Sequence, residues 1–72
     1  MKKRSVNISG HATSITLETE FWGLLKAIAA RDKKSINALI SEIDENRAGN
    51  NLSSAIRLYV LKDVMKEKNK QT

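Results

Sequence analysis

Residues 11–17 have the sequence His11-Ala12-Thr13-Ser14-Ile15-Thr16-Leu17. Polar and apolar residues alternate along its second half and β-branched residues are frequent, as is typical of a half-buried β-strand. Because successive side chains of a strand point to opposite faces, Ile15 and Leu17 share one face. We predict that this face packs on a core and that the other face, formed by Ala12, Ser14 and Thr16, is exposed.

The segment before this strand, residues 1–10, is less regular. Val6 and Ile8 also alternate with polar residues, but they occupy even positions, whereas the apolar residues of the strand occupy odd ones. Gly10 lies between the two segments, where a turn or a bulge can reset the phase. We therefore predict a basic extended arm over residues 1–10 and a single strand over residues 11–17.

Three amphipathic helices are predicted after the strand, because apolar residues recur three and four positions apart. The first begins near Thr19 and ends near Asp32, and the second has Ser35 as its N-cap and stops before Gly49. The third begins between residues 51 and 53. Their inward-facing stripes are, in chain order, Phe21, Leu24, Leu25 and Ile28, then Ile36, Leu39, Ile40 and Ile43, then Leu52, Ala55, Ile56, Tyr59 and Val60.

Two features indicate that a second copy of the chain completes the fold. A lone strand leaves its backbone donors and acceptors unpaired, and the third helix has a second apolar stripe made of Leu58, Leu61 and Met65. With 72 residues, no cysteine and one histidine, the chain also lacks disulfides and a thiolate or imidazole metal site as sources of stability. We predict an obligate homodimer whose strands pair as an antiparallel ribbon across a two-fold axis.

The predicted fold class is mostly α with one short strand, in the order strand and three helices. We expect an arm over residues 1–10, a folded domain over residues 11–65 and a Lys-rich tail over residues 66–72. The residues assigned to the dimer core are Ile15, Leu17, Leu39, Ile40, Ile43, Ile56 and Val60.

The net charge of +5 is concentrated at the two ends of the chain. Residues 1–17 contain Lys2, Lys3 and Arg4 and no acid, residues 18–61 contain six bases and six acids, and residues 62–72 contain four lysines and two acids. Such ends either solubilise the protein or capture a polyanion, usually nucleic acid. With no apolar run that could span a membrane and no apolar segment after the basic start, a cytoplasmic protein is predicted.

Catalysis is disfavoured by the motifs of the chain. The three glycines are isolated at positions 10, 23 and 49, so there is no phosphate-binding glycine loop, and no serine lies in a nucleophile elbow. The acids Glu42, Asp44 and Glu45 are typical of a solvated helix face. We predict that the protein is not an enzyme and needs neither a cofactor nor a metal.

Duplex DNA is the partner that the strand and the second helix favour. A two-stranded ribbon fits the major groove, and serine and threonine side chains can bond to donors or acceptors on base edges. The N-terminus of the second helix at Ser35 follows Lys33 and Lys34, an arrangement suited to a phosphate. Each feature also has a simpler interpretation. The outer strand residues can form an ordinary solvent-exposed sheet face, and Ser35 can be a helix cap without a phosphate.

The chain resembles bacterial ribbon-helix-helix proteins of the Arc/MetJ superfamily over residues 4–62. The resemblance lies in Ser14-Ile15-Thr16-Leu17-Glu18 followed by Glu20-Phe21-Trp22, and in residues 35–44 and 51–61, which are similar to a subgroup with an added third helix. It implies an intertwined homodimer that places its β-ribbon in the major groove and holds phosphates at the N-termini of the second helices.

The resemblance assigns base contacts to Ala12, Ser14 and Thr16. The basic charge at the start of the chain indicates further DNA contacts by an arm, at Lys2, Lys3 and Arg4. The phosphate contacts fall on Lys33, Lys34, Ser35, Ile36 and Asn37. The sequence departs from the pattern at Ala12, where a longer polar or basic side chain is expected, and at Lys33-Lys34, where a glycine often stands.

The predicted function is that of a transcriptional repressor that occupies an operator as one or more dimers and excludes polymerase. One alternative is an antitoxin-like protein whose C-terminal helix and tail bind a partner protein. Another is a structural dimer whose DNA-binding face has decayed.

Overall fold

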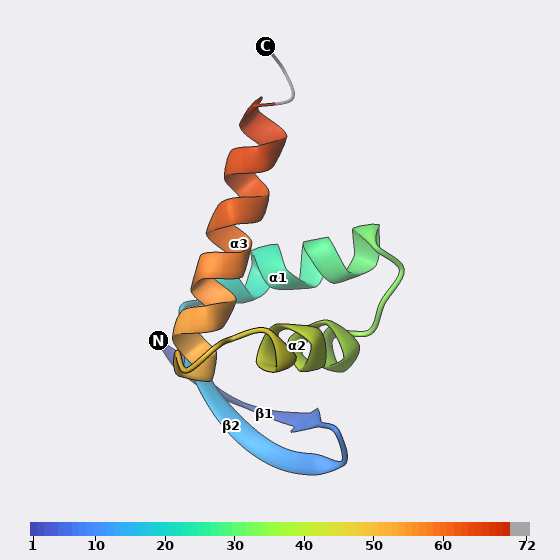
Figure 1. Ribbon diagram of the computed structural model, residues 1–72, viewed down its shortest axis with the longest axis vertical. Coiled ribbons are helices and arrows are strands. Elements are labelled where there is room, and N and C mark those ends of the chain that lie inside the picture. Colours follow the sequence, from blue (N-terminus) through green and yellow to red (C-terminus); the bar gives the residue numbers. More distant parts are fainter. Residues whose placement is uncertain (70–72) are drawn as a thin grey trace.

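The computed structural model describes residues 1–69, with side chains through residue 66. Two strands, β1 (Lys2–Ile8) and β2 (His11–Leu17), are followed by three helices, α1 (Thr19–Arg31), α2 (Ile36–Glu45) and α3 (Leu52–Asn69). The strands form a hairpin at one end of the molecule, and the helices lie on one side of it (Figure 1).

The hairpin joins β1 to β2 within a single chain. The strands are antiparallel, with Lys2 opposite Leu17 and Ile8 opposite His11. Ser9 and Gly10 link them with φ values of 51° and 83°, as in the two-residue turns whose twist suits a hairpin. The predictions of a single strand and of a free arm over residues 1–10 are therefore wrong.

The phase change between the two segments is what this register requires. In this register, each residue at an even position of β1 faces a residue at an odd position of β2, and residues that face each other lie on the same face of the sheet. Val6 and Ile8 consequently lie on the same inner face as Ile15 and Leu17, and all four are buried. Because β2 pairs with a strand of its own chain, it does not need a second copy as its partner. This reason for predicting an obligate dimer therefore no longer holds.

One core fills the space between the hairpin and the helices. Leu17, Leu25, Ile40, Ile56 and Val60 have no exposed surface, and no polar or charged residue is buried among the described residues. All seven residues predicted for the dimer core are buried by the single chain. A second copy therefore has almost no surface of these residues left to cover.

The helix ends follow local capping chemistry. The predicted N-cap Ser35 accepts a hydrogen bond from the backbone N–H of Ala38 (3.0 Å) and so caps α2, as expected. Asn51 caps α3 in the same way, through the N–H of Ser54 (2.8 Å). α1 begins at Thr19, near where the sequence predicted its start, and its N-cap is Glu18, whose side chain makes no capping bond.

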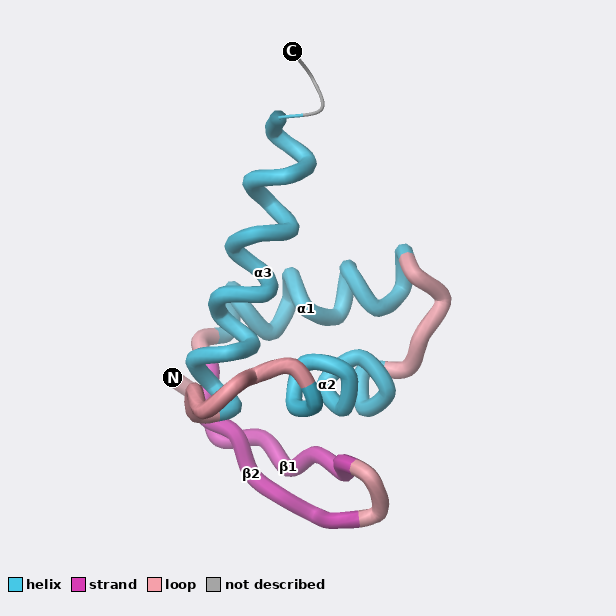
Figure 2. The backbone as a smooth tube through the Cα atoms, viewed as in Figure 1, coloured by secondary structure: helices cyan, strands magenta, loops and turns pink. Residues whose placement is uncertain are grey.

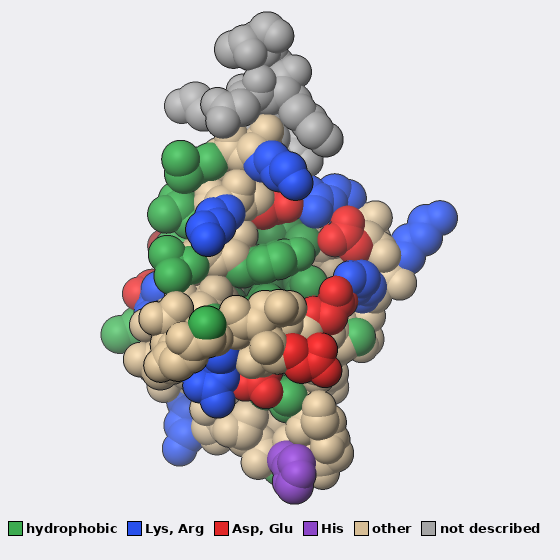
Figure 3. Space-filling model, viewed as in Figure 1, with side chains coloured by type: hydrophobic (Ala, Val, Ile, Leu, Met, Phe, Trp, Pro, Cys, Tyr) green, Lys and Arg blue, Asp and Glu red, His purple; other side chains and the backbone are tan. Residues whose placement is uncertain are grey.

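Two helix faces remain exposed. Leu24, predicted to lie in the core stripe of α1, is 43% exposed, so that prediction is wrong. The upper part of α3 extends away from the hairpin beyond α1 (Figure 2), and apolar side chains follow one of its sides (Figure 3). The exposed large apolar residues of α3 are Leu58, Leu61, Val64 and Met65.

The Lys-rich tail predicted over residues 66–72 begins inside α3, and residues 70–72 lie outside the described residues. In the part of the chain that the structure describes, no helix is long and apolar enough to cross a membrane.

Candidate nucleic-acid interface

The outer face of the hairpin points away from the helices (Figure 1). Its members alternate with the buried residues along both strands, and every one of them is exposed. They face one another in three cross-strand pairs, Lys3 with Thr16, Ser5 with Ser14 and Asn7 with Ala12. The three residues predicted on this face, Ala12, Ser14 and Thr16, thus lie beside a second row contributed by β1.

The charged side chains of the hairpin are all basic. Neither strand contains an acid, and β1 begins with Lys2, Lys3 and Arg4. The acidic side chains of the face seen in Figure 3 gather over the helices rather than over the hairpin. The outer face therefore presents hydroxyl, amide and ammonium groups without a carboxylate that would repel an anion.

The three basic residues predicted as a DNA arm do not lie together. Lys3 is on the outer face, whereas Arg4 is on the inner face, opposite Ile15. The Arg4 guanidinium lies 4.5 Å from the centroid of the Trp22 ring, a cation–π contact, and its Nε is buried without a hydrogen-bond partner. Arg4 thus packs β1 on α1 and is separated from the outer face.

The turn into α2 has the geometry expected of a glycine. Lys33 has a φ of 57°, in the left-handed region that costs a residue with a Cβ about 1–2 kcal/mol. Its side chain is exposed, and it makes no ion pair with any described residue. This lysine takes the conformation that a glycine adopts without strain, and a positive charge stands just before the helix N-terminus.

Lys34 is engaged with α2 itself. Its Nζ donates a hydrogen bond to Oε2 of Glu42, and this bond raises the pKa of Lys34. The Lys34 side chain is 37% exposed, and its ammonium group is paired with a carboxylate. A phosphate at this helix end would have to compete with Glu42 for Lys34, but it would meet no such competitor at Lys33 among the described side chains.

Asn37 ties the first turn of α2 to the hairpin. Its Oδ1 accepts a hydrogen bond from the backbone N–H of Asn7 (3.3 Å), while Ile36 is half-buried against the core. Of the five residues predicted to bind phosphate, Ser35 caps the helix and Asn37 anchors β1. Both have structural roles, and their contacts with DNA remain predictions.

Arg57 was not singled out by the sequence. Its guanidinium donates to Oε1 of Glu18 (2.8 Å) and to the backbone oxygen of Thr16 (3.5 Å), which joins α3 to the end of β2. The bond from Arg57 lowers the pKa of Glu18. No local pattern reveals such a pair, because 39 positions separate its partners.

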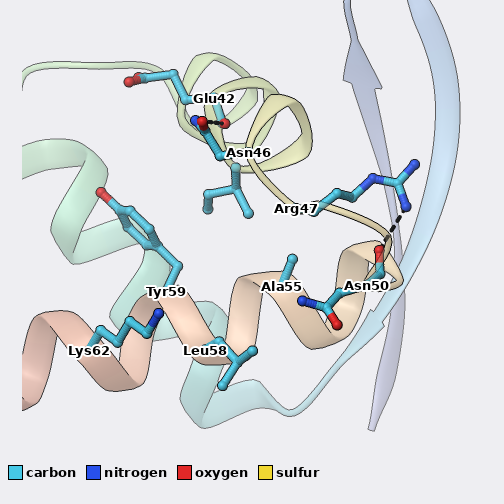
Figure 4. Close-up of a pocket in the computed structure, with 9 residues that line it drawn as sticks. Glu42, Asn46, Arg47, Asn50, Ala55, Leu58, Tyr59 and Lys62 are labelled. Atoms are coloured by element: carbon cyan, nitrogen blue, oxygen red, sulfur yellow. Dashed lines mark hydrogen bonds between the residues drawn. The ribbon is translucent and has the colours of Figure 1, made fainter.

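A groove of about 300 Å³ lies between α2 and α3 (Figure 4). In this groove, Asn46 donates to the backbone oxygen of Glu42 (2.8 Å) and Arg47 donates to that of Asn50 (2.9 Å). Its apolar part is formed by Ile43, Ala55, Leu58 and Tyr59. Among residues 1–66, whose side chains the structure describes, no three His, Cys, Asp or Glu residues come together in a way that could hold a metal ion.

A two-stranded hairpin packed on three helices, with a basic and polar outer face, defines a small protein suited to polyanion binding. The chain matches the family model of the ribbon-helix-helix domain over residues 1–64, and it belongs to that family. This confirms the resemblance found in the sequence and makes the chain a DNA-binding protein in general terms, of a kind that typically acts as a dimer. No curated protein and no solved structure matches the chain.

Proposed function

We propose that this protein is a homodimeric, sequence-specific regulator that binds duplex DNA with its hairpin in the major groove and represses transcription by occupying an operator. The observation that carries the proposal is the outer face of the hairpin, where six exposed residues form three pairs without an acid among them. Membership of the ribbon-helix-helix family supports the same ligand.

The dimensions of the hairpin suit the groove. Neighbouring strands are about 4.8 Å apart, and the major groove of B-DNA is about 12 Å wide. Short serine and threonine side chains let the backbone come close to base edges. Because one chain already contains both strands, a ribbon built between subunits is not needed to fill the groove.

The second copy is expected on the outer side of α3. Leu58, Leu61, Val64 and Met65 are each between 42% and 55% exposed and lie on the helix that extends beyond the body of the fold (Figure 2). Covering such a side with the same side of another copy removes apolar surface from water. Two dimerised chains then present two hairpins to one DNA molecule.

Phosphate contacts complete the proposed complex. Lys33 stands exposed before the capped N-terminus of α2, which contributes the positive end of a helix dipole. Lys2 and Lys3 at the start of β1 are also exposed. These charges provide affinity for any duplex, while the outer face of the hairpin provides the preference for a sequence.

The experiment is an in vitro selection from a random duplex library, followed by binding measurements at several salt concentrations. We expect one enriched motif, two chains per bound duplex, and a linear fall of log affinity with log salt. Selection of no motif, together with weak binding to every duplex, would contradict sequence-specific binding.

A second candidate function is the antitoxin-like one, in which the outer side of α3 and the tail bind a partner protein. The groove between α2 and α3, lined partly by Leu58 and Tyr59, favours it, because an apolar side chain of a partner could enter there. Expression with the products of neighbouring genes tests it. A stoichiometric complex that Leu58→Ser disrupts would support this function, and purification of the chain alone in every case would contradict it.

A further inference from the structure

We propose that β1 contributes half of the base-contacting surface and that Asn7 is its specificity-determining residue. This inference rests on the proposed binding of duplex DNA. It differs from the assignment made on the sequence, which placed every base contact on β2. The observation behind it is the intrachain register, which brings an outward row of β1 against the outward row of β2.

The pairing of Asn7 with Ala12 is the central point. Ala12 offers only a methyl group at the position where a longer polar side chain is expected. Residues that face each other across antiparallel strands have Cβ atoms about 4.5–5.5 Å apart. The carboxamide of Asn7 therefore stands beside the methyl of Ala12 and can reach much of the same space.

The chemistry of the carboxamide suits a base edge. An asparagine side chain donates and accepts at once, so it can pair with N7 and N6 of adenine in the major groove. The methyl of Ala12 can lie against the methyl of a thymine. The two side chains together favour an A·T pair beneath this end of the hairpin.

The backbone of Asn7 is held in place. Its N–H donates to Oδ1 of Asn37 at 3.3 Å, and its neighbours Val6 and Ile8 are buried. A side chain presented from a fixed strand loses less conformational freedom on binding than one on a free arm. This anchoring distinguishes Asn7 from a residue of the extended arm predicted over residues 1–10.

Lys3 marks the opposite end of the same row. It lies four residues from Asn7 on the same face, a distance of about 13 Å along a strand. That length corresponds to about four base pairs at 3.4 Å each. The outer face thus has an ammonium group at one end, hydroxyls of Ser5 and Ser14 in the middle, and an amide at the other end.

The test compares Asn7→Ala with a matched control, Thr13→Ala. Thr13 is also exposed, but it lies on the opposite face of the hairpin. Wild type and both variants are measured on the duplex selected by wild type, on that duplex with each A·T pair changed in turn, and on random duplex. Thermal melting of each variant shows whether the fold is retained.

We expect Asn7→Ala to weaken binding to the selected duplex by about tenfold or more, with little change on random duplex. Its preference at one A·T pair should relax, whereas Thr13→Ala should behave like wild type. Unchanged binding by Asn7→Ala, or an equal loss on selected and random duplex, would overturn the inference and leave the proposed function standing. Failure of wild type to prefer any duplex would overturn both.

Discussion

The hairpin and α3 divide polar and apolar residues in opposite ways. Along β1 and β2 every buried residue alternates with an exposed polar or small one, so one face belongs to the core and the other to solvent. Along α3, Ala55, Ile56 and Val60 are buried, but Leu58 and Leu61 on another side are apolar and exposed.

This difference shows which kind of partner each region suits. A polar face without acids is complementary to a polyanion, whereas an exposed apolar helix side is complementary to another protein surface. We therefore propose that the chain uses two surfaces at different places, one for DNA and one for a second copy or another protein.

The largest expected effect comes from the inner face of the hairpin. Ile15 is 3% exposed, so Ile15→Ala should lower the free energy of unfolding by about 2–5 kcal/mol. Its neighbour Thr16 is exposed on the outer face, so Thr16→Ala should leave melting nearly unchanged and weaken binding to the selected duplex by about 1–3 kcal/mol. Denaturant unfolding and DNA titration check the two variants. The reverse pattern would show that the faces are assigned wrongly.

A disulfide between the strands tests whether the hairpin within one chain is the DNA-binding form. Ser5 faces Ser14, and the chain has no cysteine of its own. The double variant Ser5→Cys, Ser14→Cys should form an intrachain bridge on oxidation and gain about 2–3 kcal/mol of stability.

The reduced and oxidised forms of this same double variant are compared for DNA binding, so the effect of the two substitutions cancels. Equal affinity of the two forms would confirm that the paired hairpin binds DNA. Loss of binding on oxidation, or bridges that form only between chains, would favour a ribbon built by strands of different subunits.

The outer side of α3 is tested at Leu61, which is 50% exposed. Leu61→Ser should weaken association of two copies by about 1.5–3 kcal/mol for each side chain covered, and melting of wild type should rise with protein concentration. Sedimentation at several concentrations measures the association. Lys62→Ser is a control on the adjacent position, since it changes a charged residue. A wild-type chain that stays monomeric and well folded at low micromolar concentration would refute the dimer.

The two lysines before α2 are both predicted to contact phosphate, so their contributions to DNA binding can be compared. Lys33 makes no ion pair with a described residue, whereas Lys34 is paired with Glu42. Lys33→Ala should lower the slope of log affinity against log salt by up to about 2 in a dimer. Lys34→Ala should lower it less, because its charge is already shared. Equal slopes for wild type and Lys33→Ala would show that this helix end is a cap without a bound phosphate.

The sequence predicted local structure well and pairing poorly. Ile15, Leu17, Leu39 and Ile43 are buried as their spacing indicated, and Ser35 caps α2, because periodicity and capping depend on residues a few positions apart. The hairpin could not be predicted in this way, because the phase change around Ser9-Gly10 fits a break between two segments as well as a turn that pairs them.

For the same reason, only half of the candidate site could be predicted from the sequence. Ala12, Ser14 and Thr16 were placed on the outer face, but Lys3, Ser5 and Asn7 of β1 could be placed there only once the pairing was known. The contacts of Arg57 with Glu18 and of Lys34 with Glu42 depend on how the helices pack, and no short pattern in the sequence specifies that packing.

The smallest expected effect concerns the link between α3 and the hairpin. The bond from Arg57 lowers the pKa of Glu18, so the folded state binds a proton at this carboxylate less readily than the unfolded chain does. The stabilisation is therefore fully present above the ordinary pKa of a glutamate, about 4.3, and is lost as the pH falls through the lowered value. Both side chains are partly exposed, with 30% for Arg57 and 37% for Glu18, so the effect is small and weakens in salt. Glu18→Gln should melt slightly below wild type at pH 7 and converge with it as the pH falls through the lowered pKa of Glu18. Glu20→Gln, which removes an exposed carboxylate two positions further on, should show no such convergence. A constant difference between Glu18→Gln and wild type at every pH would mean that Arg57 stabilises this junction through packing rather than through charge.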